Sequence, residues 1–284
     1  MPFRQSVLDT VARLPASPGV YQFIGADDEL LYIGKANNIR ERVLSHWSAG
    51  TREERAQQLT QLTRHVDWIE TAGELGALLL EARLVRELKP LHNRRLRHAA
   101  EVLTWVLSED GAAPELAPLD ELPLSFEPSC ACGLYRSEEA ARKALTGIAR
   151  EHRLCLKMLG LEETRGSCFA LQLGRCAGAC VGAESLARHG LRVRLALLPH
   201  RLQPWPFEGA IGVREAGADS DGARVEVHVI DRWRHVATLR AGDSFESGRA
   251  RAPFDLDVYR ILSRHLRRVP AAQLIRVPAE SHSA

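Results

Sequence analysis

The sequence predicts an α+β protein in three parts: a small α/β domain with a central antiparallel sheet over residues 15–95, a mixed cysteine-containing region over residues 96–203, and a small α+β region over residues 204–284. Three observations predict this organisation. Two strand-like runs, GVYQFI and LLYIGK, flank the turn-rich segment GADDE near the N-terminus. Four of the six cysteines lie between residues 155 and 180. Strand-like segments resume after Pro204 and Pro206, which mark a boundary.

Local signals place the elements of the first part, which we call the N-terminal module. The two runs predict strands over residues 19–24 and 30–35, each carrying a tyrosine beside a glycine. Asn37 or Asn38 can cap the helix that follows, over residues 39–47. The remaining elements are expected to be a helix over residues 53–63, a strand over residues 66–70 and a helix over residues 74–88 that Pro90 ends.

The other two parts, the cysteine region and the C-terminal region, carry weaker signals. In the cysteine region we expect a strand over residues 101–107 followed by a polar loop and a proline-rich connection, a helix from the capping residue Ser137 to His152, and a helix over residues 184–198. In the C-terminal region we expect strands over residues 210–214, 224–230 and 233–239, a helix over residues 256–268, and a mobile tail from Pro270.

Charge and hydropathy exclude some classes of protein. The 38 basic and 36 acidic residues give a net charge of only +2, so no global field favours nucleic acid. No apolar run approaches the ~20 residues of a membrane-spanning helix, and the first residues lack the apolar core of a signal peptide. We therefore expect a cytoplasmic protein without a membrane partner, whose cysteines are reduced or metal-bound.

The helix expected over residues 74–88 holds an acidic residue in an apolar position. Its apolar residues recur at helical spacing, and Glu81 falls inside the stripe that they form. A carboxylate placed there must be paired or must hold a metal, because desolvating it alone is costly. The plainer interpretation is a glutamate buried against an arginine such as Arg42.

Two phenols, a lysine, an arginine and a carboxylate can together catalyse the hydrolysis of a phosphodiester. Tyr21, Tyr32, Lys35, Arg42 and Glu81 supply these groups, and this stretch resembles the GIY-YIG nucleases over about residues 15–95. The resemblance implies that Glu81 binds one divalent cation, Mg²⁺ or Mn²⁺, with water and phosphate as the other ligands. It also implies that Arg42 holds the phosphate and offsets charge in the transition state.

The same resemblance assigns the proton handling. Tyr32, supported by Lys35, would position or deprotonate the attacking water, because a tyrosine of ordinary pKa needs a nearby cation to act as a base at neutral pH. Tyr21 is a second candidate for this role, and the sequence does not choose between them. His46 could share it, and Asn93 would hold its loop or contact metal-bound water. Without the motif, both tyrosines would be interpreted as ordinary core residues.

Basic residues cluster just beyond the Glu81 helix. A solvated helix face is the plain interpretation, but the neighbouring motif favours contact with phosphates. The arginines that we expect to bind DNA are Arg40, Arg83, Arg86, Arg94, Arg95 and Arg97.

Cys155, Cys168, Cys176 and Cys180 form a compact group of potential thiolate ligands. Thiolates select zinc or iron–sulfur clusters, whereas the alternative is four small buried hydrophobes. The segment GRCAGAC resembles the cysteine region of the excision-repair subunit UvrC, for which an iron–sulfur cluster is the family expectation. Cys130 and Cys132 lie outside this pattern and are not assigned.

The resemblance extends along nearly the whole chain. LLLEARL, GRCAGAC, WPFEGA and FDLDVYRIL resemble the Cho family of short UvrC homologues, which lack the second nuclease domain and the helix-hairpin-helix module of UvrC. This implies an endonuclease of nucleotide excision repair that incises damaged double-stranded DNA on the 3′ side of a lesion. It also implies UvrB as a partner, although the UvrB-binding coiled-coil segment of UvrC is not evident in this sequence.

Two other functions stay open from the sequence alone. One is a structure-specific nuclease of branched DNA whose cysteines hold zinc. The other is a non-catalytic DNA-binding or scaffold protein with a decayed nuclease module, against which the intact set of site residues argues.

Overall fold

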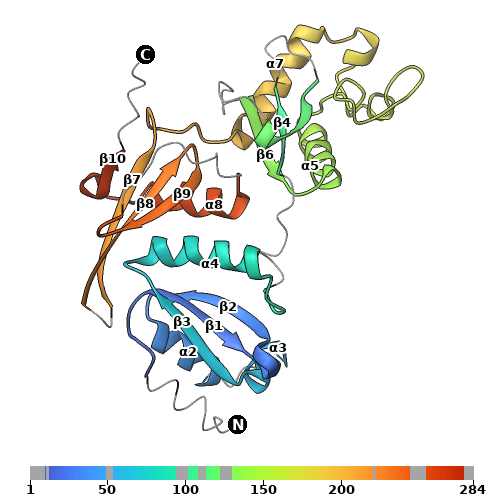
Figure 1. Cartoon of the computed structure of the whole chain (residues 1–284). Coiled ribbons are helices and arrows are strands. Elements are labelled where there is room, and N and C mark those ends of the chain that lie inside the picture. Colours follow the sequence, from blue (N-terminus) through green and yellow to red (C-terminus); the bar gives the residue numbers. More distant parts are fainter. Residues whose placement is uncertain are drawn as a thin grey trace. The chain divides into compact units, whose positions relative to one another are not determined.

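The computed structural model describes residues 10, 13–48, 54–93, 102–107, 113–121, 130–219, 222–243 and 254–277 (Figure 1). The chain forms two compact units. One contains residues 1–99 together with residues 207–284, and the other contains residues 100–206. The C-terminal region therefore folds with the N-terminal module, from which it is separated by more than a hundred residues of sequence.

The N-terminal module is built on a three-stranded antiparallel sheet, as the sequence predicts. Its order is β2-β1-β3, with Tyr21 paired to Gly34 and Phe23 paired to Tyr32 across β1 and β2. The strands are β1 (Gly19–Ile24), β2 (Leu30–Ala36) and β3 (His65–Glu70), and the helices are α2 (Ile39–Ser48), α3 (Glu54–Leu62) and α4 (Glu74–Leu88).

Helices cover both faces of this sheet because successive strand residues point to opposite sides. Tyr21 and Phe23 of β1 pack with Ile39 of α2 in one buried cluster. Val20 and Ile33 pack with Val85 of α4 in another. Each fully buried aliphatic side chain contributes about 1.5–3 kcal/mol, so the two clusters fix α2 and α4 on opposite sides of the hairpin.

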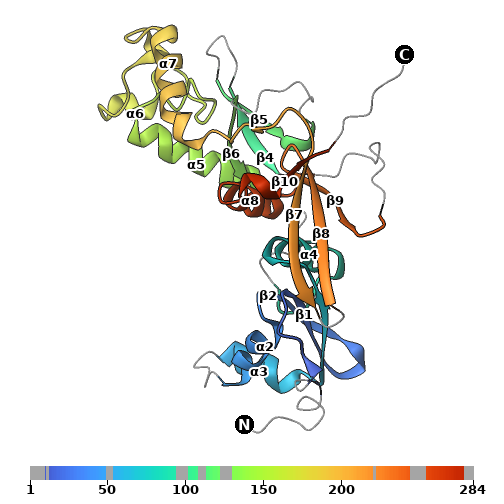
Figure 2. The ribbon, with the colours of Figure 1, turned by 90° about the vertical axis from the view of Figure 1, so that its left-hand side faces the viewer.

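The C-terminal region forms a four-stranded antiparallel sheet of order β10-β7-β8-β9. Its long hairpin pairs residues from Ile211 with Ile230 to Asp219 with Gly222 (Figure 2). The elements are β7 (Ile211–Asp219), β8 (Gly222–Asp231), β9 (Arg234–Arg240), α8 (Leu256–His265) and β10 (Leu274–Arg276).

Carboxylates of this sheet contact the start of α4. Glu215 accepts hydrogen bonds from the backbone N–H groups of Leu75 (2.9 Å) and Gly76 (2.8 Å), and Glu226 accepts one from that of Ala72 (3.0 Å). The N-cap of α4 is Gly73, which has no side chain to bind these donors. Glu215 therefore caps α4 from more than a hundred residues away, and a helix N-terminus favours a negative charge there.

The second unit combines a small sheet with three helices. The sheet has the order β5-β4-β6. Trp105 of β4 and Cys132 of β6 pack against Leu145 of α5 and Leu197 of α7. The elements are β4 (Leu103–Val106), β5 (Glu115–Pro118), β6 (Ala131–Tyr135), α5 (Glu138–Glu151), α6 (Phe169–Gln172) and α7 (Leu186–Leu197).

Three expectations about individual elements were wrong. Residues 271–276 are not a mobile tail but a 3-10 turn followed by β10, because Leu274 pairs with Val213 on the free edge of β7. The strand β5 lies where a polar loop was expected, since ELAP shows no alternating apolar pattern. The strand over residues 210–214 continues to Asp219, because β8 pairs along its whole length.

Among the described residues, no helix combines the length and the apolar character that a bilayer crossing requires.

Candidate active site and cysteine cluster

The glycine beside each tyrosine of the hairpin is required by close packing. A Cβ atom at Gly34 would lie 2.4 Å from the hydroxyl oxygen of Tyr21, which crosses β2 at that point. A Cβ atom at Gly19 would lie 2.2 Å from the carbonyl oxygen of Ile69 on β3. Gly34 therefore lets the phenol of Tyr21 lie across β2, and Gly19 lets β1 approach β3 closely.

Four polar side chains that the sequence singles out come together over this face. The hydroxyl of Tyr21 lies 2.9 Å from Nε2 of His46. The ring centroid of Tyr32 is 6.1 Å from that of Tyr21 and 6.0 Å from that of His46. Arg42 lies one turn before His46 on α2, and its charge acts on the pKa values of both Tyr21 and His46. Tyr21 is fully buried and Tyr32 is half-buried, so Tyr32 is the phenol that is open to a ligand.

Burial controls the protonation of this group. It raises the pKa of Tyr21, and it raises the pKa of Tyr32, which the charge of Glu81 raises further. Burial also lowers the pKa of His46 to about 4, and the charge of Arg42 acts in the same direction. At neutral pH both phenols are therefore protonated, and the imidazole is neutral with a lone pair for a proton.

Glu81 projects from the middle of α4 towards the end of β2. Its Oε1 accepts a hydrogen bond from the backbone N–H of Lys35 (3.2 Å). Within the described part of the chain, Oε2 has no hydrogen-bond donor, and Glu81 lines a cavity. Burial raises the pKa of this carboxyl group against the hydrogen bond from Lys35 and the charges of Lys35 and Arg42. Among the described residues no ion pair within 4.0 Å joins Glu81 to Arg42, although the charge of Arg42 acts on this carboxyl group.

The ammonium of Lys35 has an acidic partner at the start of α4. It pairs with Oε1 of Glu74 at 2.8 Å. Glu74 begins α4 two turns before Glu81, a spacing that would have identified it as a neighbour of the site. The support of Tyr32 by Lys35 stays a prediction.

Asn93 holds the segment after α4 against the free edge of β2. Its Oδ1 accepts from the N–H of Ile33 (2.9 Å) and its Nδ2 donates to the carbonyl of Ile33 (2.7 Å). The N–H of His92 continues this pairing to the carbonyl of Leu31 (2.8 Å). The amide thus satisfies backbone groups that an edge strand would leave unpaired.

The arginines expected to bind DNA fall into three groups. Arg40 is exposed, with its Nε bonded to the carbonyl of Leu14 (2.7 Å), and Arg83 is exposed on α4. Arg86 pairs with Asp255 at the start of α8 (2.6 Å), which ties α4 to α8. Arg94, Arg95 and Arg97 lie outside the described residues.

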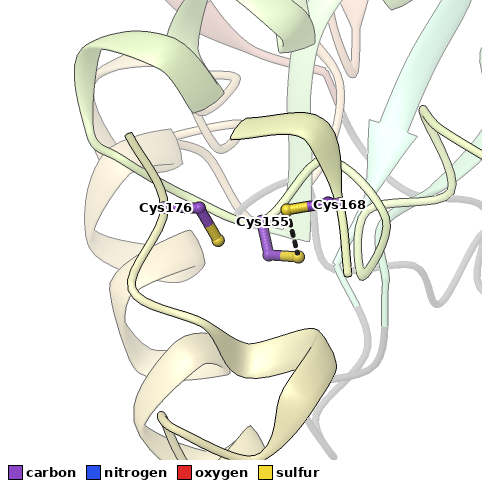
Figure 3. A group of neighbouring side chains, drawn as sticks. All are labelled: Cys155, Cys168 and Cys176. Atoms are coloured by element: carbon purple, nitrogen blue, oxygen red, sulfur yellow. Dashed lines mark hydrogen bonds between the residues drawn. The ribbon is translucent and has the colours of Figure 1, made fainter. Parts of the chain in front are cut away.

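Three of the four cysteines converge in the second unit (Figure 3). The sulfur atoms of Cys155, Cys168 and Cys176 all lie within 4.8 Å of one another, and those of Cys155 and Cys168 are 3.7 Å apart. Cys180 borders the group, since its sulfur accepts a hydrogen bond from the N–H of Cys168 (3.4 Å). Gly178, with φ of +87°, makes the turn that brings Cys176 and Cys180 together.

Some backbone N–H groups donate to these thiols. The N–H of Gly178 donates to the sulfur of Cys176 (3.3 Å), whereas the N–H of Cys155 donates to Nε2 of His189 (3.1 Å). Burial raises the pKa of Cys168 to about 12 and also raises that of Cys176. For Cys155 burial acts in the same direction, but the N–H of Met158 and the neighbouring thiols outweigh it and lower the pKa.

Sequence reasoning missed the residues that attach the C-terminal region to α4. Glu215 and Glu226 alternate with apolar residues on strands and resemble ordinary solvated positions. It also missed Arg260, Arg264 and Arg268 of α8 and its following turn, although their four-residue spacing places them on one helix face.

Comparisons with known proteins agree with this geometry. Residues 17–94 match the UvrC-like GIY-YIG domain, residues 105–198 match the middle domain of the UvrC/Cho excinucleases, and residues 210–281 match the C-terminal domain of excinuclease Cho. Excinuclease Cho of Escherichia coli strain K12 is 42% identical over 260 residues, which cover 89% of this chain and 83% of that protein. The UvrABC system protein C of Rhodopseudomonas palustris strain CGA009 is 31% identical over 195 residues, covering 68% of this chain and 27% of that protein.

Among solved structures, the GIY-YIG endonuclease domain of UvrC from Thermotoga maritima, bound to its catalytic magnesium, is 26% identical. The match covers 32% of this chain and 99% of that one, with a TM-score of 0.30.

The hairpin, the site that it carries and the matching family models define a UvrC-like GIY-YIG endonuclease. The chain belongs to the excinuclease Cho family, the short UvrC homologues of nucleotide excision repair.

Proposed function

We propose that this endonuclease nicks damaged double-stranded DNA on the 3′ side of a lesion, together with UvrB. The observation that carries the proposal is Glu81, whose half-buried carboxylate keeps one oxygen without a hydrogen-bond donor among the described residues. Its charge raises the pKa of Tyr32, and the charge of Arg42 acts on Glu81 in turn. The likeness to the Cho excinucleases over most of both chains supports the excision-repair substrate.

The surroundings of Glu81 fit a hard divalent cation. Mg²⁺ retains several waters and is usually held by one or two carboxylates plus substrate phosphates. Glu81 offers one half-buried carboxylate with a free oxygen, and the described residues place no trio of acidic or histidine ligands around it. When bound there, Mg²⁺ or Mn²⁺ would supply positive charge to the phosphate oxygens.

The protein groups can carry out the rest of the hydrolysis. Arg42 is exposed on α2 and can donate to the non-bridging oxygens, on which charge grows as water attacks phosphorus. The new phosphorus–oxygen bond forms as the bond to the leaving ester oxygen breaks, and that oxygen takes up a proton from the solvent. One proton from the water passes through the phenols of Tyr32 and Tyr21 to Nε2 of the neutral His46. In this scheme the half-buried Tyr32 faces the water and the buried Tyr21 connects it to His46.

Nick mapping tests this function. The full chain is incubated with UvrB, Mg²⁺ and a duplex that carries one defined lesion and a label on each strand. We expect a single nick on the 3′ side of the lesion in the damaged strand. Equal cutting of undamaged branched DNA in the absence of UvrB would instead support the structure-specific nuclease.

We further propose that Cys155, Cys168, Cys176 and Cys180 hold a metal centre. The family resemblance implies an iron–sulfur cluster. Zinc is the alternative, and the spacing of the sulfurs favours it, since 2.3 Å zinc–sulfur bonds in a tetrahedron separate the sulfurs by about 3.8 Å. Iron and acid-labile sulfide in the purified protein would support the cluster, and zinc alone would support the alternative. Absence of bound metal from protein purified without oxygen would contradict both.

A further inference from the structure

A cavity of about 590 Å³ lies between α4 and α8 of the C-terminal region. Glu81 and Glu74 line it from α4, and residues of α8 and the turn after it line the opposite side. The side chain of Glu81 therefore shares this cavity with α8. The groups on that side include Arg260, Arg264 and Arg268.

These three arginines form one face of α8 and its following turn. They are four residues apart, which on a helix means neighbouring positions about 6 Å apart along the axis. The opposite face of α8 is buried through Val258, Tyr259 and Leu262. The arginines are exposed, and the buried face fixes the direction in which they project.

Their charges are largely uncompensated. Arg260 has an acidic neighbour in Asp257 at 3.7 Å. In the part of the chain that the structure describes, no carboxylate lies within 4.0 Å of the guanidinium of Arg264 or Arg268. An ordinary solvated helix face often carries arginines without acidic partners. It does not usually share a cavity with a half-buried carboxylate such as that of Glu81.

The attachment of α8 keeps this arrangement fixed. The pair between Arg86 and Asp255 joins α4 to the N-cap of α8. Glu215 joins the start of α4 to the C-terminal sheet. Glu81 and the arginines of α8 therefore lie on helices that are tied to each other.

Electrostatics indicates the ligand. The carboxylates of Glu74 and Glu81 would repel a polyanion, so a DNA strand whose phosphate reaches Glu81 needs positive charge beside it. The arginines of α8 supply that charge along a line, as a row of phosphates requires. We propose that α8 binds the DNA backbone next to the phosphate that is cut, through Arg260, Arg264 and Arg268. This inference rests on the proposed function and assigns to the C-terminal region a part of the substrate site.

A binding experiment tests the proposal independently of cleavage. All proteins carry Glu81→Gln so that no strand is cut, and fluorescence anisotropy measures affinity for an undamaged labelled duplex at several salt concentrations. We expect Arg264→Ala with Arg268→Ala to weaken binding about tenfold or more and to lower the salt slope by about two, since each phosphate contact contributes about 0.9. Arg267→Ala is the matched control, because Arg267 is exposed in the same turn but does not line the cavity.

A second variant separates charge from folding. Arg264→Lys with Arg268→Lys keeps both charges and should retain most of the salt slope, while thermal unfolding confirms that each variant is folded. Equal affinity and salt slope in the double alanine variant and its parent would overturn the proposal, as would a parent that does not bind duplex DNA. These outcomes do not depend on where, or whether, the active enzyme cuts.

Discussion

The hydroxyl of Tyr21 lies 2.9 Å from Nε2 of His46, within a group of aromatic rings that leaves Tyr21 buried and His46 half-buried. This contact joins strand β1 to helix α2 at the phenol that Gly34 allows to cross the sheet. A neutral imidazole in this position can accept a proton, and it also fixes the orientation of the phenol.

Removing His46 should slow incision without preventing folding. We expect His46→Ala to lower the rate by about 10²-fold, the lower end of what a positioned proton acceptor contributes. His65→Ala on β3 is the control, since His65 pairs with the exposed Asp67 on the far strand. Single-turnover incision at saturating DNA measures the rate. An unchanged rate in His46→Ala would remove His46 from the mechanism.

The same histidine should make the fold sensitive to acid. Folded His46 takes up its proton only near pH 4, whereas an unfolded histidine does so near pH ~6.5. Between these values the unfolded state binds more protons, so the free energy of unfolding decreases as the pH falls from about 6.5 towards 4. His235, with its pKa also lowered to about 4 by burial, acts in the same direction.

Thermal unfolding at pH 7.5 and pH 5 measures this effect. We expect the Tm of His46→Gln to fall less between the two pH values than that of the parent. The variant His65→Gln should follow the parent. Equal losses of Tm in His46→Gln and the parent would contradict the lowered pKa.

Glu81→Gln should separate activity from stability. The amide oxygen can keep the hydrogen bond from Lys35, and the substitution removes a charge that burial disfavours. We therefore expect the free energy of unfolding to stay constant or to rise, while incision falls by about 10²–10³-fold. Calorimetric titration should show that Mg²⁺ binding is lost as well. A variant that still binds Mg²⁺ and cuts DNA would show that Glu81 is not the metal ligand.

Gly34→Ala should damage both stability and activity. The new methyl group would overlap the phenol of Tyr21, and such overpacking costs about 1–3 kcal/mol. Gly147→Ala is a control with the opposite sign, because Gly147 is an exposed position of α5 with nothing within 4 Å of the added carbon. It should stabilise the protein by about 0.5–1 kcal/mol. Chemical denaturation measures both, and a stable, active Gly34→Ala would contradict the packing argument.

Much of the N-terminal module could be predicted because its information is local. The hairpin is specified by two runs of alternating side chains and a turn. Glu81 becomes a candidate site residue because it lies within the apolar stripe of its helix. The position of Lys35 was not predictable, because the choice between Tyr32 and Glu74 depends on how the first turn of α4 meets β2. The strand β10 was missed for a similar reason, since three residues become a strand only when β7 offers its edge.

The cap on α4 has a consequence for the folding of this enzyme during its synthesis. Glycine at residue 73 leaves room for the side chain of Glu215, because a Cβ atom there would lie 2.4 Å from its carboxylate oxygen. The helix that carries Glu81 therefore has no capping side chain at its own N-cap, and a segment synthesised more than a hundred residues later supplies the cap. A ribosome-bound chain that ends before β7 would contain the candidate catalytic residues, but its helix α4 would lack the cap from Glu215. Because a lost cap costs about 0.5–2 kcal/mol, we expect α4 to reach its full stability only after β7 has been synthesised.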